Sequence, residues 1–155
     1  DDGGGAGDGG NPAPAAATDE PAVDVSIFDP ENVLELVGGN TAVLKRLLQK
    51  FDCSPMLLEA RAALAEADAT KLRNAAHAMK GQLKYMQAHA AAEAAHALEK
   101  EARALEGEHV DAHGDGAWGW SGECKERLTV MAATLRVEVE RVDANRRAIL
   151  AELDA

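Results

Sequence analysis

The stretch ATKLRNAAHAMKGQLKYMQ, residues 69–87, decides which fold this chain is expected to adopt. Its apolar residues recur at alternating spacings of four and three, which places them on one face of an α-helix. These residues are Leu72, Ala76, Met79, Leu83 and Met86. His77 points away from this apolar face. The residues that share the face of His77 by spacing are Arg73, Lys80, Gly81 and Lys84. The stretch therefore predicts an amphipathic helix that presents a histidine among cations.

The downstream sequence continues the helical pattern. The spacings of four and three return at Ala91, Ala95, Leu98, Ala102 and Leu105. No helix breaker separates the two stripes, so one continuous helix over 69–105 also fits the pattern. We place a turn near residues 87–89, because a compact domain needs one there. A seven-residue apolar repeat then predicts a long last helix over about 122–152. Its members are Leu128, Leu135, Val142 and Ile149.

The upstream sequence carries helix boundaries. Asp29 followed by Pro30 is typical of a helix start, and Gly38 is typical of a helix end. A second pattern begins near Thr41 and meets Pro55, which removes a helical hydrogen bond and clashes with the preceding turn. We expect either a kink there or two shorter helices. Four long amphipathic helices behind a short leading one predict an all-α, antiparallel four-helix bundle.

Composition divides the chain into a tail and one domain. Residues 1–26 are rich in Gly, Pro, Ala and Asp without apolar periodicity, so we expect a disordered tail or linker. The bundle is expected over 27–155, with a Gly-rich loop over 106–121 before the last helix. Hydrophobic residues make up 46% of the chain but aromatic residues only 3%, which favours close helix packing over a β-sheet.

The distribution of charge narrows the class of partner. The net charge of −11 disfavours nucleic acid and anionic membranes as partners. Residues 69–92 nevertheless contain no Asp or Glu and carry four Lys or Arg residues. This local basic surface predicts a partner with an acidic surface. No apolar run approaches the ~20 residues that span a bilayer as a helix.

A family resemblance rests on the motif HAMKG, residues 77–81, and on its flanks. Ala88 follows the histidine by eleven residues, and Leu98 and Glu99 close the pattern. The approach also matches, with FDPENVLELVGGNTAVLKRLLQKF over 28–51 and then Pro55. Together these features resemble a histidine-containing phosphotransfer (HPt) domain over about residues 27–106. Three positions depart from the family pattern, namely Gln82 in place of a small residue, Gln87 in place of a turn glycine and Ala91 in place of leucine.

The resemblance implies a phosphorelay intermediate. His77 would accept a phosphoryl group from a receiver-domain aspartate and pass it to another receiver, with Lys80 offering charge to the phosphoryl oxygens. Gly81 would leave room for the receiver, and Glu99 would hydrogen-bond the imidazole. The partners implied are response-regulator receivers and a hybrid histidine kinase, in the cytoplasm, or in the nucleus if the source is eukaryotic. No cofactor of its own is implied, since Mg²⁺ is expected on the receiver.

The residue chemistry agrees with these implied roles. A neutral imidazole keeps a lone pair on one ring nitrogen for attack on phosphorus, and a carboxylate on the other nitrogen stabilises the cationic ring. Phosphoryl transfer depends mainly on positioning and charge, which a receiver largely supplies. Arg73 and Lys84 are expected to steer an acidic receiver surface. The chain lacks a nucleotide-binding pattern, so it is expected to be a phosphoryl carrier rather than a kinase.

Several alternatives stay open from the sequence. The domain could be a kinase substrate, like the phosphorylated domain of chemotaxis kinases, which His96 beside Glu99 resembles. It could also be a bundle that docks receivers without carrying phosphate. A weaker hypothesis is a metal site in the Gly-rich loop, with ligands from His109, Asp111, His113 and Asp115.

Overall fold

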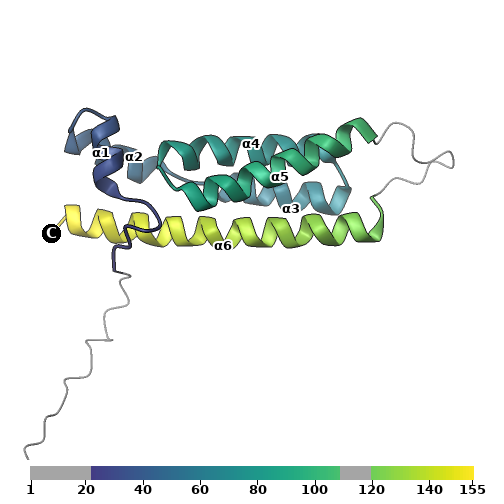
Figure 1. Ribbon diagram of the computed structural model, residues 1–155. Coiled ribbons are helices and arrows are strands. Elements are labelled where there is room, and N and C mark those ends of the chain that lie inside the picture. The colour runs from purple at the N-terminus through teal and green to yellow at the C-terminus, as the bar shows by residue number, and fades with distance from the viewer. Residues whose placement is uncertain (1–21, 109–119) are drawn as a thin grey trace, which may run out of the picture.

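The computed structural model describes residues 22–108 and 120–155, and this part of the chain is helical without strands. Six helices follow one another (Figure 1): α1 (Pro30–Leu36), α2 (Thr41–Lys50), α3 (Ser54–Glu66), α4 (Ala69–Tyr85), α5 (His89–Glu108) and α6 (Gly122–Leu153). The all-α prediction is confirmed. Pro55 lies in the first turn of α3, so the interruption at this proline separates two helices rather than kinking one.

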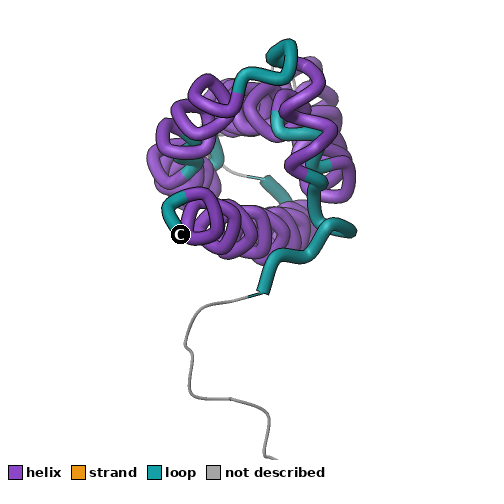
Figure 2. The backbone as a smooth tube through the Cα atoms, turned by 90° about the vertical axis from the view of Figure 1, so that its left-hand side faces the viewer, coloured by secondary structure: helices purple, strands orange, loops and turns teal. Residues whose placement is uncertain are grey.

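Helices α3 to α6 form the bundle, and each runs antiparallel to the one before it (Figure 1). Seen along the bundle, the helices are arranged as a ring (Figure 2), and their apolar faces meet in one core. Helices α1 and α2 lie at the end of the bundle where α6 finishes. The large side chains that are most fully buried in this core are Phe28, Leu48, Leu72, Met79, Leu83, Leu98, Leu128 and Leu135.

Helix α4 forms as its sequence predicts. Asp68 caps its start, since a side-chain oxygen accepts a hydrogen bond from the backbone N–H of Lys71 at 2.9 Å. All five residues of the predicted apolar face are buried, four of them within α4 and Met86 just after it. Burial of each large apolar side chain contributes about 1.5–3 kcal/mol. The opposite face of α4, with His77, is left at the surface.

The turn between α4 and α5 falls where the sequence places it, and it excludes one continuous helix over 69–105. Gln87 adopts a left-handed conformation with φ of 60°. The N–H of Ala88 donates to the carbonyl of Leu83 at 3.0 Å, and the N–H of Gln87 donates to that of Lys84 at 3.0 Å. These two bonds form a Schellman C-terminal motif, in which glycine usually takes the left-handed position. A glutamine there costs roughly 1–2 kcal/mol of backbone strain.

The segment before α1 packs against the C-terminal part of α6. The buried amide of Asn145 accepts a hydrogen bond from the N–H of Asp24 at 2.7 Å and donates to the carbonyl of Phe28 at 3.1 Å. Val23 also packs against the core. Val23 and Asp24, which the composition places in the tail, therefore contact the domain, while Val25 is exposed.

Three further predictions concern the Gly-rich loop, the tail and a membrane span. Helix α5 continues to Glu108, so the first residues of the predicted 106–121 loop are helical. Residues 1–21 and 109–119, which include most of that loop and most of the predicted tail, lie outside the described residues. Within the part of the chain that the structure covers, no helix is both long and apolar enough to cross a membrane.

Candidate functional site

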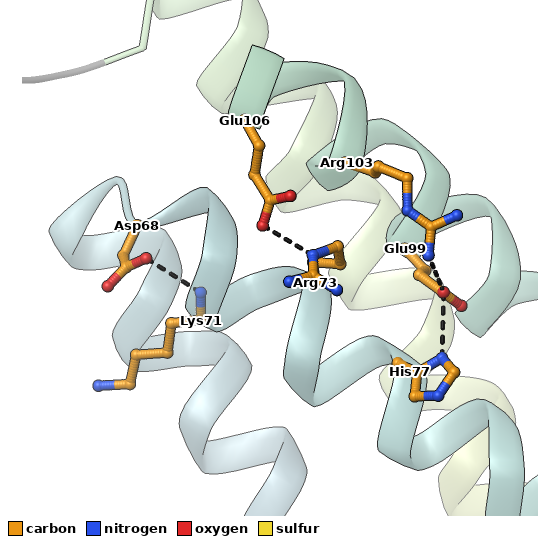
Figure 3. Close-up of polar contacts among 7 residues, drawn as sticks. All are labelled: Asp68, Lys71, Arg73, His77, Glu99, Arg103 and Glu106. Carbon is orange, nitrogen blue, oxygen red and sulfur yellow. Dashed lines mark hydrogen bonds and ion pairs between the residues drawn. The ribbon is translucent and has the colours of Figure 1, made fainter. Parts of the chain in front are cut away.

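His77 stands on the exposed face of α4 beside a carboxylate from α5. Its side chain is 65% exposed, whereas the side chain of Glu99 is only 3% exposed. His77 Nδ1 and Glu99 Oε1 lie 3.1 Å apart (Figure 3). The predicted juxtaposition of these two residues is therefore present, with the histidine open to solvent and the carboxylate enclosed.

Glu99 is held by three side chains. Lys80 Nζ lies 2.6 Å from Oε2, and an Arg103 guanidinium nitrogen donates to Oε1 at 2.9 Å, so Oε1 serves both Arg103 and His77. Burial by itself raises the pKa of Glu99, but the hydrogen bonds and charges of Lys80 and His77 outweigh it and hold the pKa below its ordinary value. The carboxylate is thus ionised at neutral pH.

The ionised carboxylate decides the tautomer of the imidazole. A carboxylate only accepts hydrogen bonds, so Nδ1 of His77 carries the hydrogen that Glu99 binds. In the neutral ring the lone pair is then on Nε2. The site consequently offers a fixed, solvent-exposed imidazole whose Nε2 is free to attack an electrophile, with a negative charge behind it.

Gly81 lies one helical turn beyond His77 and is exposed. Apart from its chain neighbours and the backbone of its own helix, a Cβ atom added there meets no atom of the described residues within 4 Å. Packing inside this molecule therefore gives no reason for glycine, although a glycine inside a helix costs about 1 kcal/mol relative to alanine. The surface of α4 is therefore open at this position.

The other predicted cations differ in their surroundings. Arg73 donates from Nε to Glu106 Oε1 at 2.7 Å and links α4 to α5 one turn before His77 (Figure 3). The hydrogen bond from Arg73 lowers the pKa of Glu106. Lys84 is exposed in the last turn of α4. Arg73 is thus engaged within the domain, while Lys84 extends from its surface.

Sequence reasoning missed Arg103. It lies four residues after Glu99 on α5, a spacing at which side chains of opposite charge pair on a helix. That spacing was the available signal once Glu99 was taken as the hydrogen-bond partner of the imidazole.

The hypothetical metal ligands His109, Asp111, His113 and Asp115 lie outside the described residues. Over 22–108 and 120–155, no cluster of three or more His, Cys, Asp or Glu residues could hold a metal ion. Trp120 is partly buried and packs against the core.

Comparison with known proteins identifies the family. The family model described as the Hpt domain matches residues 46–147, which is more than half of the chain and includes His77, Lys80 and Glu99. No curated protein and no solved structure matches the chain. Hpt domains act in histidine phosphotransfer in phosphorelays, where they interact with receiver domains and kinases. The match and the helical bundle agree, and the chain belongs to the Hpt domain family.

Proposed function

We propose that this protein is a phosphoryl carrier of a multistep phosphorelay, which takes a phosphoryl group from one receiver aspartate onto His77 and passes it to another. One observation carries the proposal: an exposed imidazole whose Nδ1 hydrogen bonds to a buried, ionised carboxylate. This arrangement leaves Nε2 as the nucleophile and keeps a negative charge ready for the ring when it becomes cationic.

The transfer follows from these positions. Nε2 of His77 attacks the phosphorus of the aspartyl phosphate, a bond from nitrogen to phosphorus forms, and the bond from phosphorus to the carboxylate oxygen breaks. The aspartate leaves with the electron pair. The ring then carries a positive charge, which Glu99 stabilises through the hydrogen on Nδ1. Attack by a second receiver's aspartate on the same phosphorus reverses these steps and returns the imidazole.

The neighbouring side chains would support this step. Lys80 lies one turn from His77 and neutralises Glu99 at 2.6 Å, which keeps the buried carboxylate in place and brings positive charge near the incoming phosphoryl oxygens. Gly81 leaves the space that a receiver needs to approach. Lys84 adds positive charge at the end of this face of α4, which favours a partner with an acidic surface. We expect Mg²⁺ to be bound by the receiver and not by this domain.

Incubation with a phosphorylated receiver tests the proposal. The protein should acquire an acid-labile phosphate, and His77→Gln should acquire none. His96→Gln is the matched control, because His96 is an exposed histidine on α5 and should not affect uptake. A wild-type protein that stays unlabelled, or a His77→Gln protein that is labelled, would contradict the proposal. Label that arrives only from an ATP-charged kinase domain would instead identify a kinase-substrate domain.

A further inference from the structure

We propose that the protein binds a small apolar carboxylate in a pocket between α3 and α6, separate from the phosphotransfer site. The pocket has a volume of about 400 Å³, within the roughly 300–1,000 Å³ that small-molecule sites occupy. Its lining includes Met79 of α4. Residues two positions apart on a helix point about 200° apart, so Met79 faces away from His77 and the pocket opens on another side of the bundle.

The interior of the pocket is apolar because of the side chains that meet there. Met79 and Leu98 are fully buried and come from α4 and α5, so they form the floor. The walls include Leu57 on α3 and Ala132 on α6. Alanine side chains fill little of the space between two helices, which leaves a cavity that an apolar ligand could fill and so remove from water.

The rim of the pocket is cationic. Arg61 of α3 and Arg136 of α6 both line it, one from each side. Arg136 has Glu140 as a loose partner at 3.9 Å, and its side chain is 61% exposed. Among the described residues, no ion pair involves Arg61. Two guanidinium groups at an apolar opening are complementary to a carboxylate, which they can bind through paired hydrogen bonds.

This combination selects the class of ligand. A protein with a net charge of −11 repels anions in general, so the two arginines mark a local exception at the pocket. A carboxylate held at the rim would place its attached hydrocarbon against the partly exposed walls, which include Leu57 and Ala132. The ligand we infer is therefore a compact molecule with one carboxylate and an apolar body.

Titration calorimetry of the whole chain with hexanoate, octanoate and decanoate, below their micelle concentrations, tests the inference. We expect saturable binding of one ligand per chain, with affinity rising about 4-fold for each added methylene until the pocket is full. The Arg61→Ala/Arg136→Ala double variant should weaken octanoate binding about 2- to 5-fold per arginine. Its affinity for 1-octanol should not change. Arg127→Ala, an exposed arginine on α6 outside the pocket, is the control.

A second pair of variants tests the location. Ala133 is exposed and lines the pocket, so Ala133→Trp should block the opening without disturbing the core and should abolish binding. Ala151→Trp, also exposed on α6 but outside the lining, should bind like the wild type. Absence of saturable binding by octanoate and decanoate, or binding that survives Ala133→Trp, would overturn the proposal. So would a wild-type dimer that Ala133→Trp converts to a monomer, since the pocket would then be an interface between copies.

Discussion

Two carboxylates on α5, Glu99 and Glu106, reach across to α4 (Figure 3), and their surroundings differ. Glu106 makes an ion pair with Arg73 in which both side chains are partly exposed, at 26% and 30%. Glu99 is 3% exposed and pairs with an exposed histidine. The first pair joins two helices at the surface. The second places a buried charge behind a ring that solvent and a partner can reach, which is what a nucleophilic imidazole requires.

The largest expected difference between the two carboxylates is that between the variants Glu99→Ala and Glu106→Ala. Glu99→Ala removes the acceptor for His77 and the partner of Lys80, so we expect phosphoryl transfer to fall about 10- to 100-fold. It should also lower the free energy of unfolding by about 1–3 kcal/mol. Glu106→Ala should cost less than about 1 kcal/mol and leave transfer nearly unchanged. Urea unfolding and rapid-quench transfer assays measure both quantities. Equal transfer losses in the two variants would remove the distinction.

Gly81→Ala should stabilise the protein and slow phosphoryl transfer. The added methyl group has no close neighbour among the described residues beyond its own helix, so the free energy of unfolding should rise by about 1 kcal/mol. The same methyl group should obstruct the receiver and lower the transfer rate by about 10-fold or more. Gly107→Ala, at another open glycine near the end of α5, is the control for stability without loss of transfer. Unimpaired transfer by Gly81→Ala would show that the receiver does not approach there.

Arg103→Ala should have a smaller effect, which concerns the equilibrium of phosphorylation between the receiver and His77. Arg103 and His77 share Glu99 Oε1, so removing the arginine leaves more of the negative charge for the ring. We expect the equilibrium between phosphorylated receiver and phosphorylated His77 to move toward the histidine by about 1.5- to 5-fold. Arg73→Ala, which affects Glu106 instead, should leave that equilibrium in place. A shift of equal size in both variants would indicate a general effect of surface charge.

The smallest expected effect is a pH dependence of stability. The folded-state pKa of Glu99 lies below its ordinary value of 4.5. The stabilisation that this ionised carboxylate provides is therefore present above that value and is lost as the pH falls through the folded-state pKa. The comparison is made in the His77→Gln background, because the ring of His77 changes charge in the same pH range and also contacts Glu99. The difference in unfolding free energy between His77→Gln and the His77→Gln/Glu99→Gln double variant should be constant from pH 7 to 5 and shrink below about 4.5, because Lys80 still stabilises the ionised carboxylate. Urea midpoints across this range test it, and a difference that grows on acidification would contradict the sign.

The sequence predicted the helices better than the contacts between them. The apolar stripes of α4 and α6 were predicted because their spacing reports directly which face is buried. The position of the α4–α5 turn carried little signal, since Gln87 is not a usual residue for a left-handed conformation. The fully enclosed Glu99 could not be predicted from spacing, because its burial depends on how α4 and α5 pack. Its proximity to His77 was expected only from the family resemblance.

The buried amide of Asn145 has a consequence for the order in which the chain can assemble. Its two partners, Asp24 and Phe28, precede it by 121 and 117 residues. During synthesis at about 5–20 residues per second, these early residues are made roughly 6 to 24 seconds before their partner. The first packed segment of the domain must therefore wait until most of the last helix, α6, has been made. Docking of residues 24–28 is a late event in assembly, and it takes place at the end of the bundle where α6 finishes.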